Sequence, residues 1–191
     1  MKFFSFDENT RQIVINDEGI LLTREFESLL EVNRNKCKED KTGNKKLKAF
    51  KEFKYIYLAL DWESPYFNLM ERLKHETALA DSLLTEEEFG DETFRAACRK
   101  YEEIQNSNIS IRLLKSAMKS VESLIHYLDN VDLSERNPAD GKPVFKSKDL
   151  IAEIKGSKDV IVGLKELEKQ VKKEMETSTG LRGNTEAGYY D

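Results

Sequence analysis

Residues able to bind a metal are few in this chain of 191 residues, whose only histidines are His75 and His126. Glu71 and His75 are four residues apart, the spacing that places two metal ligands on one face of a helix. No third ligand accompanies them, and such pairs also occur on ordinary charged helices. His126 stands beside a core position of a heptad pattern, which is typical of packing at a core boundary. We therefore expect no metal site.

The sequence lacks the motifs that bind nucleotides or activate a nucleophile. The stretch "TGNKK", residues 42–46, has neither the spacing nor the preceding strand of a phosphate-binding loop. Neither a Gly-x-Ser-x-Gly elbow nor a Gly-x-Gly-x-x-Gly turn occurs. Carboxylate pairs such as Glu102 and Glu103 are frequent where 35% of residues are charged, so they do not indicate acid–base catalysis. Because catalysis needs groups that converge in one pocket, we expect a protein that is not an enzyme and needs no cofactor.

The composition favours helices over strands and turns. Only 3 Pro and 9 Gly occur, hydrophobic residues make up 39%, and the charged fraction of 35% exceeds the usual level of about 25%. A lean core under a charged surface indicates a mainly α fold, an elongated helical bundle or a body that neighbouring subunits complete. Cys37 and Cys98, without a secretory segment, indicate free thiols in a reducing compartment. No apolar run of about 18 residues occurs, so we expect no membrane span.

The net charge of −5 is unevenly distributed along the chain. Between Arg34 and Lys54 there are nine cations and three acids, so this segment is +6 and the remainder is −11. A solvated helix face is one interpretation. The other is contact with an acidic partner surface or with nucleic acid, for which Lys45, Lys46 and Lys48 are candidate contacts. A nucleic-acid-binding packaging or assembly module that uses Lys36–Lys54 is therefore an alternative function, although the overall acidity and the lack of a helix-turn-helix signature disfavour it.

The expected elements begin with a β-hairpin in residues 1–22, where "KFFSF" and "RQIVIN" flank the polar turn "DENT". A lone hairpin is marginal in water, so it must pack on helices or join a sheet. A helical body is expected in residues 23–131, with Thr23 as a helix cap and a second helix over 45–60. Further along, Asp91 is expected to cap a long helical stretch, and "NSN" at 106–108 to kink it.

The stretch "LDWESPYF", residues 60–67, interrupts the helical pattern. Proline costs little at the first position of a helix, and the serine before it can cap. We therefore expect one helix to end near Asp61 and another to run from Pro65 to about Leu84. The residues of this second helix expected to face inward are Leu69, Leu73, Ala80 and Leu84. The residues expected to form the corner between the two helices are Asp61, Trp62, Ser64, Pro65 and Tyr66.

The clearest pattern in the chain is a heptad repeat, which indicates a packed seam inside a bundle. Its positions are Ile104, Ile111, Leu114, Met118, Val121, Ile125 and Leu128, with Ser107 as the exception. Residues 132–147 carry two of the three prolines and an Asp-Gly dipeptide, which predict an exposed loop or small hairpin. Two similar segments, beginning at Ser147 and Ser157, predict a double helix cap, with C-terminal helices over 148–176.

The last segment, residues 177–191, has three glycines, small polar residues and a terminal Tyr-Tyr, so it cannot form a core. One interpretation is a disordered end. The other is an extended C-terminal arm that docks on a neighbour by strand addition or aromatic anchoring. The candidate residues of such an arm are Gly180, Leu181, Arg182, Gly183, Gly188, Tyr189 and Tyr190.

Two stretches resemble structural proteins of tailed bacteriophages, notably the crAss-like phages. The first is "FKYIYLALDWESPYFNLMERLKHETAL", in which an aromatic helix ends in an Asp and a Ser-Pro-Tyr turn, and an Arg-bearing helix follows. The second is "LKELEKQVKKEMETSTGLRGNTEAGYYD", a charged helix followed by an Arg-Gly element and a short aromatic tail. The first stretch has 27 residues and the second has 28, in a chain of 191.

This resemblance implies a head-to-tail connector, an adaptor or neck ring protein. Such proteins are helical, assemble as twelve-fold rings beneath the portal protein and extend terminal arms onto neighbours. The implied partners are further copies of the chain, the portal protein, adjacent neck or tail proteins and DNA passing through the channel. The implied location is the virion, with assembly in the host cytoplasm. Ring interfaces join two different patches, so surfaces of opposite charge would suit them.

Overall fold

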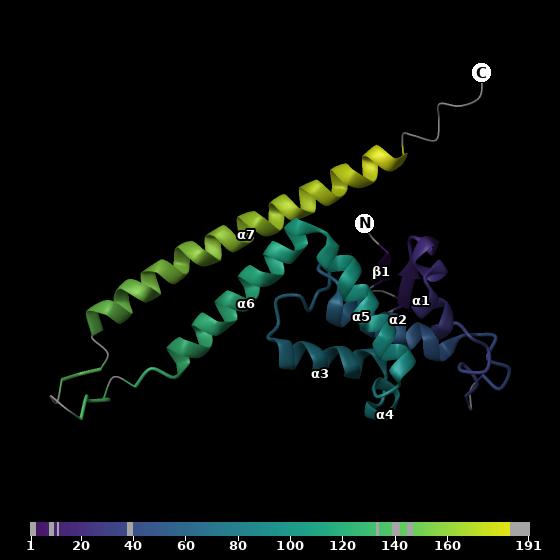
Figure 1. Ribbon diagram of the computed structural model, residues 1–191, viewed down its shortest axis with the longest axis horizontal. Coiled ribbons are helices and arrows are strands. Elements are labelled where there is room, and N and C mark those ends of the chain that lie inside the picture. Colours follow the sequence, from purple (N-terminus) through teal and green to yellow (C-terminus); the bar gives the residue numbers. More distant parts are fainter. Residues whose placement is uncertain are drawn as a thin grey trace, which may run out of the picture. The chain divides into compact units, whose positions relative to one another are not determined.

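The computed structural model is mainly helical with a small N-terminal hairpin, which confirms the predicted fold class (Figure 1). It describes residues 3–7, 10, 12–37, 40–132, 134–138, 142–144 and 147–183, with the backbone alone at 147, 149, 150, 153 and 176–183. The elements are β1 (Phe4–Asp7), β2 (Gln12–Ile15), the 3-10 helix η1 (Glu18–Leu22), α1 (Arg24–Leu29), α2 (Leu47–Leu60), α3 (Glu71–Ser82), α4 (Glu86–Phe89), α5 (Glu92–Ser107), α6 (Ile109–Asp129) and α7 (Ser147–Gly183). They form two compact units, residues 1–109 and 110–191.

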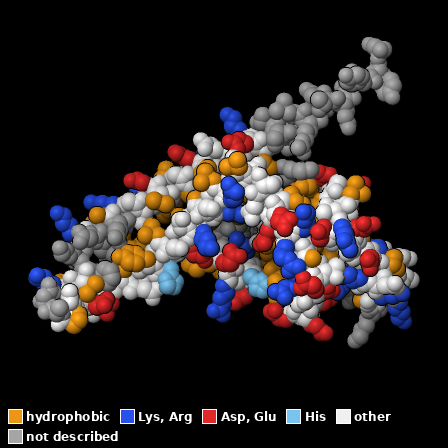
Figure 2. Space-filling view, viewed as in Figure 1, with side chains coloured by type: hydrophobic (Ala, Val, Ile, Leu, Met, Phe, Trp, Pro, Cys, Tyr) orange, Lys and Arg blue, Asp and Glu red, His pale blue; other side chains and the backbone are white. Residues whose placement is uncertain are grey.

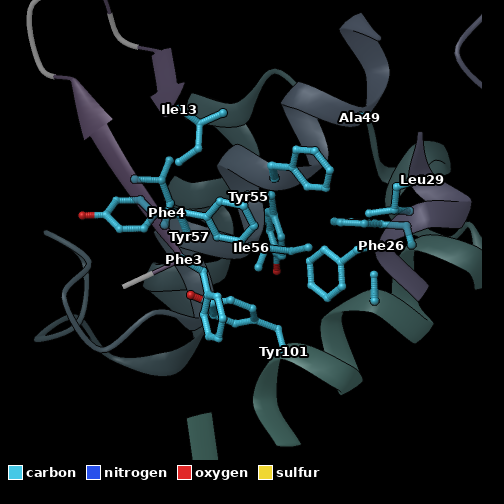
Figure 3. Close-up of a cluster of buried hydrophobic side chains, with 14 of the residues drawn as sticks. Phe3, Phe4, Ile13, Phe26, Leu29, Ala49, Tyr55, Ile56, Tyr57 and Tyr101 are labelled. Atoms are coloured by element: carbon cyan, nitrogen blue, oxygen red, sulfur yellow. The ribbon is translucent and has the colours of Figure 1, made fainter. Parts of the chain in front are cut away.

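The first unit has an aromatic core (Figure 3). Phe4 of β1 stacks on Phe53 of α2 and Tyr101 of α5, with ring centroids 5.6 and 5.7 Å apart, and Phe26 of α1 lies against the same rings. Aromatic pairs at these separations add about 0.5–1.5 kcal/mol each beyond the area that they bury. The hairpin is therefore stabilised by packing on helices of its own chain.

The two strands of the hairpin pair antiparallel, with Phe4 opposite Ile15 and Asp7 opposite Gln12. The Asp7 carboxylate accepts hydrogen bonds from the backbone N–H and the hydroxyl of Thr10, at 3.4 and 2.8 Å. An aspartate that binds the backbone a few residues ahead favours a turn. The predicted hairpin and its polar turn therefore agree with the structure at the described positions.

The corner after α2 differs from the prediction, because the next helix begins at Glu71 and not at Pro65. The Ser64 hydroxyl donates to the carbonyl of Leu58 and accepts from the backbone N–H of Tyr66 at 3.0 Å. These bonds close successive turns instead of capping a helix, and Pro65 remains exposed. The five residues predicted for the corner do lie at it, and three of them, Asp61, Trp62 and Ser64, are buried.

The inward-facing side of α3 also differs from the prediction. Ala78 and Ser82 are buried, whereas Leu73 and Ala80, both expected inside, are exposed. Leu84, which follows the helix, is buried as expected. Ala78 and Ser82 are four residues apart and share one row of the helix, whereas Leu73 and Ala80 lie on the opposite side.

Helix starts and stops between residues 85 and 109 follow local capping chemistry. Asp91 accepts a hydrogen bond from the N–H of Thr93 at 2.9 Å and caps α5, as predicted. The expected acidic link before it contains the short helix α4, whose cap, Thr85, forms a reciprocal capping box with Glu88. The helical path breaks at Asn108, at the predicted "NSN". Thr23 precedes α1 as expected, but its side chain makes no capping bond there.

The α1–α2 loop, residues 30–46, is held by buried polar side chains. Asn35 donates to the carbonyls of Leu29 and Glu31 and accepts from the N–H of Ala49, at 2.7, 2.9 and 2.9 Å. The carboxylate of Asp40 accepts from the N–H groups of Gly43 and Lys45, at 3.0 and 2.7 Å. Both of these buried side chains thus have partners, and Asn35 ties the loop to both helices.

The second unit is a hairpin of α6 and α7. The hydroxyl of Ser110, at the start of α6, donates to the carboxylate of Glu174, late in α7, at 2.6 Å, so the helices run antiparallel (Figure 1). Buried hydrophobic side chains among its described residues are Ile111, Leu114 and Val171. In the connection between the helices, Arg136 and Pro143 form an antiparallel bridge, and the described residues 134–138 and 142–144 are exposed.

The C-terminal helix α7 corrects two predictions. It is a single helix from Ser147 to Gly183, so the segment at Ser157 does not begin a second helix. Helix continuation through Gly156 and Ser157 satisfies each backbone group internally, which outweighs a local cap signal. Residues 177–183 of the predicted arm have helical backbone, and residues 184–191 lie outside the described residues.

Replacing Gly43 by alanine tests the rigidity of the α1–α2 loop. Gly43 has a φ of 73°, and an added Cβ would lie 2.1 Å from the carbonyl oxygen of Val32. We expect Gly43→Ala to lower the free energy of unfolding by more than about 1 kcal/mol, measured by urea denaturation. The control is Gly90→Ala, where φ is negative and the nearest atom is 3.3 Å away. Equal effects of the two substitutions would contradict the proposed constraint.

Candidate functional site

The candidate functional site is the α1–α2 loop with the first turn of α2, because it holds the three lysines predicted to contact a partner. Lys45 is exposed, but Lys46 donates its ammonium group to the carbonyl of Leu30. Lys48 forms an ion pair with Asp91, with Nζ and Oδ2 3.0 Å apart. Of the three, therefore, only Lys45 presents its charge outward.

Other cations of the predicted basic segment divide in the same way. Arg34 is mostly buried, and Lys54 lies over the ring of Phe6 at 5.2 Å from its centroid. Lys36 and Lys41 are exposed, and Lys36 also donates to the side chain of Asn33 at 2.8 Å. The outward charge of the described loop is thus concentrated on Lys36, Lys41 and Lys45. We call these three residues the loop lysines.

Behind the loop lysines lies a buried charged network that joins three elements. Arg34 makes two hydrogen bonds to the carboxylate of Glu52 in α2, both 2.5 Å, and a third to Asp91 at 2.9 Å. Glu52 is fully buried, so its charge depends on this paired geometry with Arg34. The network consists of Arg34, Lys48, Glu52 and Asp91. It connects the loop to α2 and to the start of α5.

The pKa values of the two carboxyl groups in the network are shifted in opposite directions. Burial raises the pKa of Glu52, and the hydrogen bonds and charge of Arg34 only partly offset this. Burial also acts to raise the pKa of Asp91, but the hydrogen bond from Lys48 and the charge of Arg34 outweigh it and lower that pKa to about 2. Asp91 therefore remains ionised while it caps α5 and holds both cations.

The turn inside the loop is also electrostatically fixed. Burial acts to raise the pKa of Asp40, but hydrogen bonds from the Thr42 hydroxyl and from the N–H groups of Lys45 and Gly43 lower it overall. The N–H of Asp40 donates in turn to the Sγ of Cys37, at 3.3 Å. Side chains on this loop therefore project from a preformed backbone, which reduces the entropy lost on binding a partner.

The two cysteines differ in exposure. Cys37 is exposed on the α1–α2 loop, whereas Cys98 lies within α5, largely covered. Burial, with the charge of Glu102 adding to it, raises the pKa of the Cys98 thiol to about 12. Neither is paired in a disulfide, as expected for free thiols.

The residues of the corner are structural partners of the core. Asp61 accepts a hydrogen bond from the hydroxyl of Tyr101 and another from the N–H of Glu63, the latter at 2.7 Å. Burial, followed by the charge of Asp61, raises the pKa of Tyr101. Tyr66 donates its hydroxyl to Asp81 in α3. These contacts fix the turn between α2 and α3.

The two histidines are in different settings. His75 Nδ1 lies 2.6 Å from the hydroxyl of Tyr55, and its ring packs on Phe89, with centroids 4.7 Å apart. His126 is exposed, and its Nδ1 lies 3.2 Å from the amide nitrogen of Asn130. The described part of the chain contains no group of three or more potential metal ligands.

The predicted arm contacts are only partly covered by the structure. The backbone of Leu181 and Arg182 forms part of α7, and their side chains are not among the parts of the chain that the structure describes. Tyr189 and Tyr190 lie outside the described residues altogether. No helix in the described ranges combines the length and the apolar content that a bilayer crossing requires.

Comparison with known proteins finds no matching family model, no matching curated protein and no matching solved structure.

The sequence indicated the basic segment but not the network beneath it. Glu52 looked like one more charged residue in a charged helix, and Asp91 only like a helix cap. The position of Glu52 in the sequence could have indicated its buried ion pair. Glu52 stands one residue before Phe53 and four before Ile56, on the broad apolar face of α2. A carboxylate on that face requires a buried cation.

Changing Asp91 to asparagine tests the electrostatics of the network by its pH dependence. The pKa of Asp91 is about 2 in the folded chain and about 3.9 in an unfolded one, so its ionised form stabilises the fold above about pH 4. That contribution, about 2 kcal/mol, is lost as the pH falls toward 2. We expect the difference in unfolding free energy between wild type and Asp91→Asn to shrink over this range in urea titrations. Parallel curves would contradict this assignment.

Charge reversal at neighbouring lysines distinguishes structural from outward cations. Lys48→Glu brings a carboxylate to Asp91 and Glu52, so we expect it to cost about 2 kcal/mol or more of unfolding free energy. Lys45→Glu, the matched control, changes an exposed side chain and should cost less than about 1 kcal/mol. Thermal denaturation followed by circular dichroism measures both. A stable Lys48→Glu variant would show that the ion pair with Asp91 contributes little. Binding tests of this segment should therefore alter the loop lysines and keep Lys46 and Lys48.

Proposed function

We propose that this chain is a non-enzymatic structural subunit of a phage head-to-tail connector, which assembles into a ring beside the portal protein. The observation that carries the proposal is the small core of the second unit. Of the buried hydrophobic residues in the described chain, only Ile111, Leu114 and Val171 belong to the α6–α7 hairpin. Two helices with so few buried side chains need neighbours to cover them, since helices in proteins are stabilised mainly by tertiary packing.

The first unit supplies a second feature that suits an assembly protein. Its buried polar groups, including Asn35, Asp40 and the charged network, hold the α1–α2 loop in one conformation. The loop lysines on its surface are suited to an acidic patch on a neighbouring subunit, and the chain outside residues 34–54 carries a net charge of −11. A rigid loop that presents charge to a differently charged patch matches the head-to-tail contacts of a ring.

The resemblance noted in the sequence adds the context of the virion. The first of the two similar stretches, residues 53–79, forms the later part of α2, the corner and most of α3, and the second covers the end of α7 and the residues after it. A connector role places the portal protein on one side of the ring and neck or tail proteins on the other. A connector role also agrees with the use of the buried polar side chains, which hold the α1–α2 loop in place and do not form a catalytic site in this proposal.

Truncation at the end of α7 tests this function. We expect the full chain to form a ring with the portal protein of the same genome, with a mass that native mass spectrometry gives as a multiple of the subunit. A chain that ends at Gly183 keeps the whole of α7 and should lose binding to the portal by at least about tenfold, because the proposed arm has lost its aromatic end. The matched control lacks residues 184–188, so that Tyr189 and Tyr190 follow Gly183 directly, which restores the aromatic residues without the spacer.

Two results would overturn the proposal. The first is a full chain that does not bind the portal at any ratio. The second is full-length chain that instead shifts duplex DNA in gels with a steep dependence on salt, a shift removed by changing the loop lysines to glutamate. That outcome would favour the packaging module.

A further inference from the structure

A group of exposed apolar side chains lies along the part of the α6–α7 hairpin next to its connecting segment, and Figure 2 shows hydrophobic side chains at the surface of these helices. We call it the hairpin surface. Its members are Ile125 and Tyr127 of α6 and Ile151, Ile154, Val160, Ile161 and Val162 of α7. Those from α7 are between 46 and 54% exposed. This is far more than the isolated exposed leucine or valine that any protein surface carries.

Four of the five members of the hairpin surface on α7 lie on one side of that helix. Ile154 and Ile161 are seven residues apart on one row, Ile151 and Val162 are eleven apart on the next, and Val160 lies on another side. Apolar rows on one side of a helix are normally covered by another element. Helix α6 alone covers one side, so this part of α7 lacks cover within the hairpin.

The lengths of the two helices explain why cover is lacking. At 1.5 Å per residue, the 21 residues of α6 span about 31 Å and the 37 residues of α7 about 55 Å. Since Ser110 bonds to Glu174, equal rise along both helices brings Asp129, the last residue of α6, level with about residue 155. Ile151 and Ile154 therefore lie on a portion of α7 that extends past the end of α6.

The described part of the hairpin therefore leaves this surface without cover. Another chain, or another part of this one, must supply it.

The size of the hairpin surface suits a second copy of the chain. Fully burying an aliphatic side chain removes roughly 60–120 Å² from water, so seven half-exposed side chains offer on the order of 350 Å² of apolar area per copy. Two copies give about 700 Å², and with the usual polar share of an interface the total is on the order of 1,200 Å². This is the lower edge of the range for specific protein interfaces.

The charge next to the surface is also compatible with pairing of identical chains. Residues 147–164 contain three lysines, two aspartates and one glutamate, so their net charge is zero. Two copies therefore do not repel each other there, and no single sign of charge favours an acidic or a basic partner. Two hairpins that pair through such faces form a four-helix bundle, a common way to complete a two-helix element.

We propose that the hairpin surface is a self-association site, and that the same surface of a second copy of the chain covers it. The proposal depends on the connector function only in that both require the chain to form oligomers. It adds a contact between like surfaces, separate from the head-to-tail contacts of the ring and formed by the two apolar rows of α7 and the last turns of α6. Ile154 and Ile161, seven residues apart at the centre of the surface, are expected to contribute most.

The double variant Ile154→Asp with Ile161→Asp tests this site in the full chain. It places two carboxylates in the expected interface, and sedimentation equilibrium should show association weakened by about a hundredfold or more relative to wild type. The matched control is Lys169→Asp, which makes the same charge change of −2 at an exposed position of α7 outside the surface. The control should associate like wild type, and circular dichroism should show equal helix content in all three proteins.

Cross-linking of the wild-type chain provides a second measurement that needs no substitution. Lys155 and Lys158 are exposed beside the surface. In a mixture of ¹⁴N- and ¹⁵N-labelled chains, we expect cross-links from these lysines to join light and heavy copies. Cross-links found only within one chain would show that the chain covers its own surface and would overturn the proposal.

The remaining outcomes separate this site from the connector function. Wild-type chain that stays monomeric across a dilution series, or a double variant that associates like wild type, would overturn the site. A double variant that associates weakly by itself but still forms rings on the portal would support both the site and the connector function, because a contact between like surfaces is not one of the head-to-tail contacts of a ring. Association through the surface by a chain that does not bind the portal would support the site and remove the connector function.

Discussion

The fold of the first unit depends on a buried charge, the carboxylate of Glu52. It has no contact with water, so it requires the paired hydrogen bonds from Arg34, and Arg34 can reach it only if the α1–α2 loop closes over α2. Asp91 then accepts one hydrogen bond from Arg34 and one from Lys48 and caps α5 as well. One buried acid thus determines the path of a loop and the position of a helix start far away in sequence. Removing a single partner would leave a buried charge unpaired, which costs more than the intact network contributes.

The aromatic core and the charged network stabilise the first unit in different ways. Phe4, Phe53 and Tyr101 bring β1, α2 and α5 together through apolar area, which has little directional preference. The hydrogen bonds of Asn35, Asp40 and Arg34 then select one arrangement of the connecting loop. The second unit has no comparable set of buried polar groups among its described residues and has few buried apolar ones. This contrast agrees with the proposal that the first unit presents a rigid loop and that a second copy of the chain covers the second unit.

Sequence patterns were informative wherever structure depends on nearby residues. The period of apolar residues located α2, the cap at Asp91 located α5, and "NSN" located the break before α6. Two errors came from local signals that distant contacts override. Ser64 and Pro65 look like a helix start, but the Ser64 hydroxyl donates a hydrogen bond to the carbonyl of Leu58 instead of capping a helix. Ser157 looks like a cap, but α7 continues through it. The charged network joins residues 34, 52 and 91, and no local pattern reports a partner 57 residues away.

The contrast between the two thiols has a practical consequence. Because burial raises the pKa of Cys98 to about 12, that sulfur stays protonated and shielded near neutral pH, where only thiolates react rapidly with maleimides or iodoacetamide. Cys37 is exposed on the same loop that presents Lys36, Lys41 and Lys45. The natural chain therefore carries one accessible attachment point, and a fluorophore placed there would sense whatever approaches the loop without any engineered cysteine.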